Sequence, residues 1–129
     1  MQFVAANHRA VLATTRADGA TQLSPVAAGV DGDVVVVSTR QTAMKTKNLR
    51  RHPRATLLVF TDDFYGDWVQ VEGPVEVVAL PEAMDGLVAY YRQLSGEHPD
   101  WDDYRAAMER EQRVLLRITV ERAGPDTAG

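Results

Sequence analysis

The stretch RAVLATTRADGATQLSPVAAGVDGDVVVVST, residues 9–39, contains three strand-like segments separated by two tight turns. Each turn carries an Asp-Gly pair, at residues 18–19 and 31–32, which is a strong hairpin signal between β-rich segments. Pro25 marks the middle segment as an edge strand or a bulge, because proline donates no hydrogen bond to a sheet. The four valines of residues 34–37 are typical of a strand buried on both faces. The stretch therefore predicts an antiparallel meander with strands at 9–15, 21–30 and 34–39.

Three further strands and three helices are predicted after residue 40. The strands are RATLLVFT (54–61), WVQVEGPVEVVAL (68–80), with a bend or bulge at Gly73 and Pro74, and RVLLRITVER (113–122). The helices cover 42–52, 81–94 and about 100–110, and the second has an apolar face made of Met84, Leu87, Val88 and Tyr91. Six mainly antiparallel strands with short helices predict a mainly β fold. A small β-barrel fits best because it removes exposed sheet edges, but the pattern alone also fits a sandwich.

Length and composition favour a single domain over residues 1–129, with a frayed tail at about 123–129. The apolar share of 45% and the charged share of 25% are ordinary for a globular protein. The absence of cysteine excludes disulfides and thiolate catalysis. Residues 1–8 lack a signal-peptide pattern, and no apolar run approaches the length of a membrane span. We therefore expect a cytoplasmic protein with no membrane partner.

Positive charge is concentrated in residues 40–54, which hold six of the fourteen Lys and Arg of a chain whose formal net charge is −4. No Asp or Glu occurs from residue 34 to residue 61. Because the predicted helix follows a strand directly, free backbone N–H groups near Ala43 and Met44 would lie beside Ser38, Thr39 and Lys45. A helix N-terminus, hydroxyls and a cation are the usual parts of a phosphate site. Farther along the chain are the outer cations Lys47, Arg50, Arg51 and Arg54. They either attract an extended anion or only face solvent.

Other candidate sites are weaker. Residues 22–26, QLSPV, offer an amide and a hydroxyl, but a plain edge strand is the simpler interpretation. His98 and the acids of residues 100–103 lack the regular spacing of metal ligands, and acids are favoured at a helix start in any case, so we expect no metal. No nucleophile motif, P-loop or dinucleotide fingerprint occurs, and His8 and His52 are interpreted as surface residues. No catalytic residue is predicted.

Residues 10–39, 45–59, 71–78 and 90–105 together resemble the split β-barrel flavin-binding superfamily that includes the pyridoxamine 5'-phosphate oxidases. Within it, they are most similar to the actinobacterial deazaflavin-dependent oxidoreductases, which use coenzyme F420. The most specific segments are KTKNLRRHPRA and YRQLSGEHPDWDDYR, and the resemblance covers roughly residues 5–122. It implies a six-stranded antiparallel split barrel and a homodimer with two cofactor sites across the subunit interface.

The resemblance also implies roles for single residues in the helix region. Lys45 matches the lysine that holds the cofactor phosphate, beside Ser38 and Thr39 at the end of the third strand. Asn48 matches a polar contact made by the helix. Ala43 and Met44 stand where many relatives carry serine or arginine, so the phosphate would lose a bidentate partner that Arg40 or Lys47 would have to replace.

Outside the helix, the resemblance implies that Gln22, Ser24 and Pro25 lie along the cofactor ring. Trp68 matches a region that approaches the site from the other subunit. We also expect apolar surface that a second subunit would cover, and Val69, Val71 and the flank of residues 34–39 are the segments that indicate it.

The implied activity is hydride transfer from reduced coenzyme F420 to an unsaturated or conjugated small molecule, with Arg50 and Arg51 meeting the acidic cofactor tail. An FMN-binding protein or oxidase of the same fold is the nearest alternative. A non-catalytic anion-binding module, or a cofactor carrier without turnover, stays open as well. The acidity of the chain and the lack of aromatic residues among the cations argue against nucleic acid as a partner.

Overall fold

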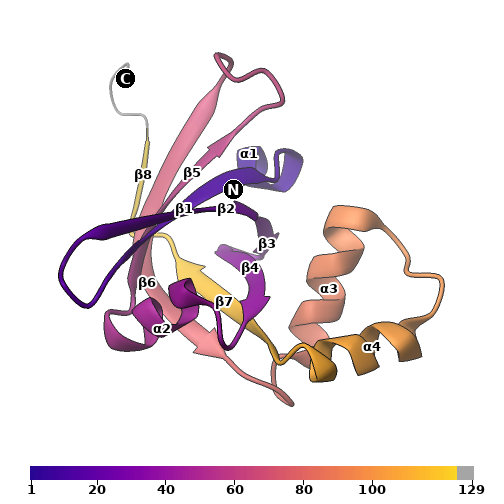
Figure 1. The fold of residues 1–129 in the computed structure, drawn as a ribbon. Helices are drawn as coiled ribbons and strands as arrows, with labels where there is room; N and C mark the ends of the chain where they lie inside the picture. Colours follow the sequence, from indigo (N-terminus) through magenta and orange to yellow (C-terminus); the bar gives the residue numbers. More distant parts are fainter. Residues whose placement is uncertain (125–129) are drawn as a thin grey trace.

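The computed structural model describes residues 1–124, whose strands form one curled antiparallel sheet (Figure 1). The first four strands are β1 (Arg9–Thr15), β2 (Thr21–Ala27), β3 (Gly29–Asp31) and β4 (Val34–Arg40). The others are β5 (Arg54–Phe60), β6 (Trp68–Val78), β7 (Arg113–Thr119) and β8 (Arg122–Gly124). Neighbouring strands follow the order β2-β1-β5-β6-β7-β4-β3, and β8 pairs with β6. The sheet therefore curls into a half-open barrel that ends in β2 on one side and in β3 on the other.

The helices of the described residues are α1 (Gln2–Ala6), α2 (Met44–Arg51), α3 (Met84–Ser95) and α4 (Trp101–Arg110). In Figure 1, α3 and α4 stand together to one side of the barrel, whereas α2 lies close to β1 and β6. The start of α4 is capped by Asp100, whose carboxylate accepts a hydrogen bond from the Asp103 N–H at 3.1 Å. The two sides of the barrel thus present different helices, and only α2 carries a basic sequence.

The apolar core has two parts, which lie on opposite faces of β4 and β7. Inside the barrel, Val35 and Val37 of β4 pack with Leu116 of β7. On the outer face of the same strands, Val36 and Leu115 pack beneath α3 and α4. This double burial explains the run of valines in residues 34–37, because a strand covered on both faces has no position where a polar side chain reaches water.

Strand β6 changes partners at Gly73 and Pro74. Up to Pro74 it pairs with β5, and from Val75 it pairs with β7. Gly73 is buried, and a Cβ at this position would overlap the backbone carbonyl oxygen of Thr119. The close approach of two backbones, rather than a turn, therefore requires glycine here.

We expect Gly73→Ala to lower the free energy of unfolding by about 1–3 kcal/mol, because the added methyl group meets backbone that cannot rotate away. Urea denaturation measures the change. Gly86→Ala is the matched control, since its Cβ would meet only a side-chain methyl of Leu115, which can move. Equal stability of the Gly73→Ala variant and the parent would contradict the close approach.

The predicted barrel of six strands is confirmed as a mainly β, curled antiparallel sheet, but the number of strands is wrong. The predicted strand 21–30 is two strands, because residues 21–27 pair with β1 whereas residues 29–31 pair with β4. The predicted strand 113–122 ends at Thr119, and β8 begins separately at Arg122. Helix α1 was not predicted. Of the predicted frayed tail, residues 123–124 belong to β8, and 125–129 lie outside the described residues.

Candidate functional site

The junction between β4 and α2 forms the start of the candidate site. The chain turns at residues 41–43, and the Thr46 hydroxyl donates to the Arg40 carbonyl at 2.7 Å. Ala43 is the N-cap residue, with an extended backbone. Met44 and Lys45 open the helix, where backbone N–H groups have no helical carbonyl four residues earlier to bond. The junction therefore provides the donors that an anion requires.

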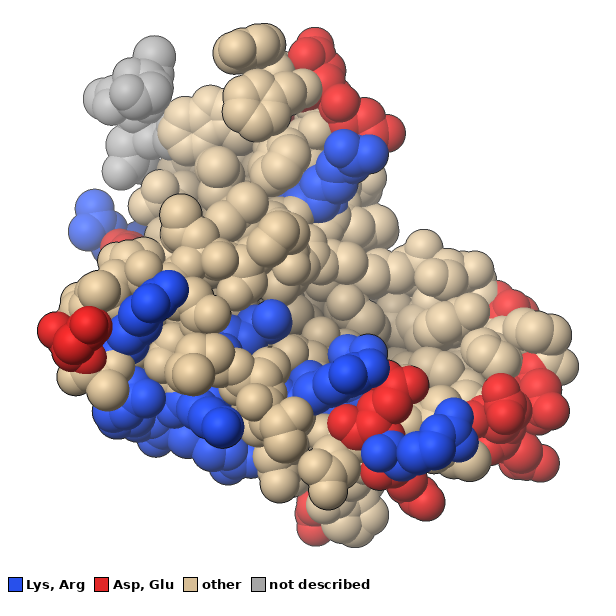
Figure 2. All heavy atoms as spheres, viewed as in Figure 1, with Lys and Arg blue, Asp and Glu red and all other residues tan. Residues whose placement is uncertain are grey.

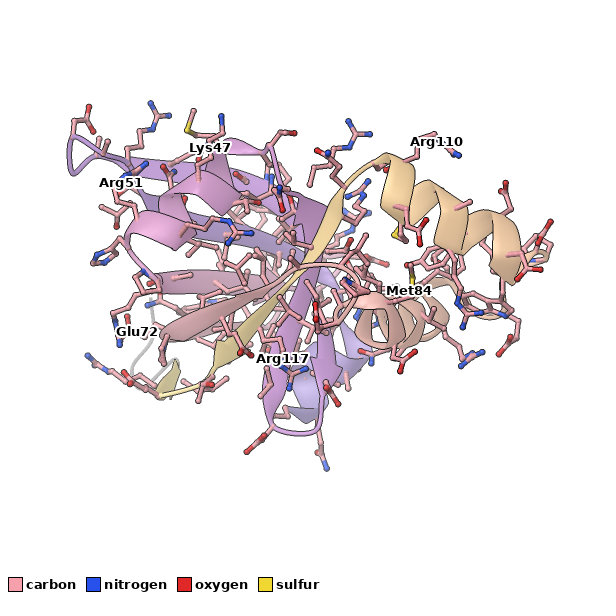
Figure 3. All side chains as sticks on the ribbon, turned by 90° about the horizontal axis from the view of Figure 1, so that it is seen from below. Lys47, Arg51, Glu72, Met84, Arg110 and Arg117 are labelled. Atoms are coloured by element: carbon pink, nitrogen blue, oxygen red, sulfur yellow. The ribbon has the colours of Figure 1, made fainter. Side chains whose placement is uncertain are left out.

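Within the described part of the chain, carboxylates do not neutralise the cations of α2. Within residues 1–124, neither Lys45 nor Lys47, Arg50 or Arg51 forms an ion pair. Lys45 is half-buried, whereas the other three are exposed. Figure 2 shows Lys and Arg side chains gathered over the region of α2, and in Figure 3 Lys47 and Arg51 extend from this helix. Positive charge without partners is typical of a surface that binds an anion.

Asn48 is a buried polar link between α2 and the sheet. Its side chain is 0% exposed, and its amide donates to the Thr14 hydroxyl at 3.1 Å and to Gln22 Oε1 at 2.9 Å. Its Oδ1 accepts from both terminal nitrogens of Arg51, each at 3.3 Å. These hydrogen bonds bring together three of the residues that sequence analysis assigned to the site. They also use both amide hydrogens of Asn48, which thereby holds α2 to β1 and β2.

The other predicted residues on the strands lie on different faces. In β2, Gln22 and Ser24 face inward, whereas Pro25 is exposed on the outer face together with Leu23. In β4, Thr39 is 4% exposed and continues the inward row of Val35 and Val37. Ser38 points the opposite way. Ser38 and Thr39 are adjacent in the sequence, and so are Ser24 and Pro25. In each case the two side chains point to opposite faces of the sheet.

Arg40 is engaged in an ion-pair cluster at the end of β4. Its guanidinium lies 3.6 Å from Glu111 Oε1, and Arg113 contacts the same oxygen at 2.9 Å. The hydrogen bond from Arg113, with a smaller contribution from Arg40, holds the pKa of Glu111 below its usual value, although partial burial opposes the shift. Arg40 therefore already has a carboxylate partner, unlike the cations of α2.

Two tyrosines of the helix pair, Tyr90 and Tyr104, donate hydrogen bonds to backbone carbonyls. The Tyr90 hydroxyl donates to the Ala27 carbonyl of β2 at 2.7 Å. Burial raises the pKa of Tyr90, and a hydrogen bond with the Ser38 backbone of β4 partly opposes the shift. Burial also raises the pKa of Tyr104 to about 12, and its hydroxyl donates to the Leu87 carbonyl at 2.8 Å. Both phenols are therefore neutral at physiological pH.

A broad apolar surface covers the outer face of β1, β2, β5 and β6. It borders a cavity of about 700 Å³ lined by Val11, Leu23, Leu58, Phe60, Phe64 and Trp68. Leu23 is 66% exposed and Phe64 is 74% exposed, which is unusual for large apolar side chains. We call these six residues the outer apolar face. Of these six residues, only Trp68 was predicted from the sequence to lie near the site.

The segments from which we expected exposed apolar surface are instead in the core. Val71 is 2% exposed, Val69 packs against the barrel interior, and the valines 35–37 are buried. The reason is the period of two along β6, which turns Trp68 and Gln70 outward and Val69 and Val71 inward. The alternating apolar residues at positions 58 and 60 of β5 were the signal that could have identified the outer apolar face.

No helix within residues 1–124 has the length and apolarity that crossing a membrane requires. The same residues contain no group of three His, Asp or Glu side chains that could hold a metal ion.

A half-open antiparallel barrel with a basic helix after β4 is the architecture of the split-barrel flavin-binding proteins. The sequence model of the pyridoxamine 5'-phosphate oxidase family matches residues 1–125, and the chain belongs to this family. The superfamily inferred from the sequence is thereby confirmed.

Solved structures agree with the family. The conserved hypothetical protein Rv2991 from Mycobacterium tuberculosis is 26% identical, with a TM-score of 0.79 over 99% of this chain and 88% of that protein. A structure described as an F420 reductase is 21% identical, with a TM-score of 0.71 over 92% of this chain and 90% of its own. The heme storage protein HutZ from Vibrio cholerae is 15% identical, with a TM-score of 0.74 over 95% of this chain and 89% of its own. At identities below 25%, the last two establish only a shared fold.

Proposed function

We propose that the chain is an oxidoreductase that uses reduced coenzyme F420 for hydride transfer to an unsaturated or conjugated small molecule. The observation that carries this proposal is the row of cations on α2, which lack carboxylate partners within residues 1–124 and begin at a half-buried lysine. Coenzyme F420 has a phosphodiester and an acidic tail, so its charge is complementary to that row. The F420 reductase of the same fold supports the choice of cofactor.

In this proposal different residues of α2 bind different parts of the cofactor. Lys45 and the N–H groups of the first helical turn bind the phosphate, as free donors beside a cation do in other proteins. Arg50 meets the acidic tail. Arg51 and Asn48 act mainly as positioning residues, because they are hydrogen-bonded to each other. When bound, the deazaflavin supplies the hydride chemistry, and the chain supplies orientation and exclusion of water.

The strands contribute the surroundings of the ring. Gln22 and Ser24 face the side of the sheet where Asn48 anchors α2. Ser24 is buried, so the half-buried Gln22 is the residue of β2 that we assign first to the ring. Pro25 lies on the opposite face and would contact a ring only from a second subunit. Thr39 is enclosed within the barrel, which leaves Ser38 as the more accessible hydroxyl of β4. Trp68 belongs to the outer apolar face and would reach the site of a partner.

Equilibrium titration with coenzyme F420 and with FMN, followed by fluorescence, tests this function. We expect both to bind and coenzyme F420 to bind more tightly, because the row of cations extends beyond the phosphate lysine. Tighter binding of FMN would favour the alternative, an FMN-dependent oxidase of the same fold, which family membership also supports. Binding of neither would overturn the redox function and leave an anion-binding module.

We further propose a homodimer joined through the outer apolar face, because large apolar side chains that remain exposed mark interfaces. The parent chain should have a dimer mass in light scattering. Leu58→Glu should convert it to a monomer, since the substitution buries a charge at the centre of that face. Met44→Glu is the control, because Met44 is also exposed but lies on α2. A monomeric parent would contradict the homodimer, whereas a dimeric Leu58→Glu variant would move the interface elsewhere.

A further inference from the structure

A second cavity, of about 360 Å³, lies between the end of β4 and the helix pair α3 and α4. Its lining includes Ser38, Tyr90, Tyr104, His98 and Arg113. No residue of α2 and no residue of the outer apolar face takes part. The volume falls within the range of small-molecule sites. The cavity is therefore separate from α2, and Ser38 is the residue of its lining that the proposed cofactor site also uses.

Aromatic rings form the walls of this cavity. The ring centroid of Tyr91 lies 5.0 Å from that of Tyr104 and 5.1 Å from that of His98. Trp101 packs edge-on against Tyr104 at 5.5 Å. The hydroxyl hydrogens of Tyr90 and Tyr104 are already donated to backbone carbonyls. These side chains therefore present ring surface, which favours a flat, apolar ligand group.

Two further side chains of the lining can donate hydrogen bonds. His98 Nδ1 accepts from the Asp100 N–H at 2.9 Å, so in the neutral ring the proton is on Nε2. Arg113 donates from Nε at 3.0 Å and is paired through Nη2 at 2.9 Å, both with Glu111 Oε1. Its Nη1 has no acceptor among residues 1–124. One neutral donor and one charged donor are thus available to a ligand.

Four charged residues lie in or beside the cavity, and Arg113 is the cation of its lining, whereas Arg40 is exposed and lies outside it. Glu111 is paired with both Arg40 and Arg113, so these three residues together carry one excess positive charge. Asp103 also borders the cavity and opposes an anion. Its side chain is exposed, however, and water and salt screen it more effectively than they screen the half-buried Arg113. The pair of donors is therefore the stronger influence.

We propose that this cavity binds a planar aromatic molecule that carries a carboxylate. The aromatic part lies against Tyr91 and Tyr104, and the carboxylate accepts hydrogen bonds from Arg113 and His98. Charge-assisted hydrogen bonds of this kind provide specificity as well as affinity. The site goes beyond the proposed redox function, and it does not require a bound cofactor.

Isothermal titration of the 129-residue chain with trans-cinnamate tests the proposal, and cinnamamide is the uncharged counterpart. We expect cinnamate to bind at least about tenfold more tightly than the amide, since the pair to Arg113 is lost in the amide. Arg113→Gln should abolish this preference. Arg117→Gln is the matched control, because Arg117 lies on the same strand and face and is also ion-paired, but its partners are Asp31 and Glu76. Figure 3 shows Arg117 near the β3–β4 hairpin, away from α4.

A second pair of variants tests the position of the site without removing a charge. Ala107→Leu would fill the cavity and should abolish binding, whereas Ala106→Leu adds the same bulk at an exposed position that does not line it. Melting curves verify that both variants are folded. Failure of the parent to bind cinnamate at millimolar concentration, unchanged binding by Ala107→Leu, or an unchanged preference in Arg113→Gln would each overturn the proposal.

Discussion

Leu87→Ala should lower the free energy of unfolding by about 2–5 kcal/mol and the melting temperature by about 10 °C. Leu87 belongs to α3 and is 0% exposed. It packs in one cluster with Val36 of β4 and Leu115 of β7. Truncation removes apolar contacts and leaves a cavity that the rigid sheet beneath cannot fill. Thermal unfolding followed by circular dichroism measures the loss.

The same variant tests whether α3 only supports the fold or also belongs to the cofactor site. The affinity of the folded Leu87→Ala protein for coenzyme F420 should stay close to that of the parent, because α3 stands apart from α2 (Figure 1). Leu94→Ala makes the same change on the same helix at a half-buried position and should cost less. A loss of affinity without a loss of stability would show that α3 belongs to the cofactor site.

Lys45→Ala should weaken the binding of coenzyme F420 and of FMN by about 10- to 150-fold, which corresponds to the ~1.5–3 kcal/mol of a charge-assisted hydrogen bond. Lys45 is the half-buried cation next to the free N–H groups of the first helical turn, where the helix dipole already favours an anion. Fluorescence titration of both cofactors measures the effect.

Two further variants on α2 act as controls. Lys47→Ala removes the same charge from an exposed position two residues on, which α-helical geometry directs to another side, so its effect should be much smaller. Arg50→Ala should weaken coenzyme F420 more than FMN and flatten the salt dependence of binding. Arg51→Ala is less suitable, because it also removes hydrogen bonds to Asn48. If Lys45→Ala bound coenzyme F420 as tightly as the parent, the phosphate site would lie elsewhere.

The parts of the fold that the sequence predicted are those where local signals and burial agree. The Asp-Gly turns and the run of valines predicted β1, β2 and β4, because tight turns and burial on both faces each require particular residue types. The break between β2 and β3 has no such signal, since it falls where the chain changes from pairing with β1 to pairing with β4. Helix α1 has five residues and no side-chain cap, so it is too short for a periodic pattern.

The candidate site shows a different limit of sequence reasoning. A polar residue on a helix has the same appearance in a sequence whether it faces a ligand or a buried partner. Asn48 was assigned to the cofactor, but its amide is bonded within the protein. Likewise, neighbouring residues on a strand share a motif and yet point to opposite faces, as Ser38 and Thr39 do. The sequence thus located the segment of the candidate site, and only the three-dimensional arrangement separates its two sides.

The hydrogen bonds of the buried Asn48 amide link α2 to β1 and to β2, so that the helix and the edge of the barrel move together. Because Asn48 is hydrogen-bonded to Gln22, a displacement of α2 would also move Gln22. This residue lies on β2, at the edge of the sheet. An anion that holds the start of α2 would therefore also slow the opening of β2, and the stabilisation would appear as a coupling free energy between two segments distant in sequence. Amide hydrogen exchange would detect it as protection of residues 21–27 when only the phosphate end of a ligand is bound.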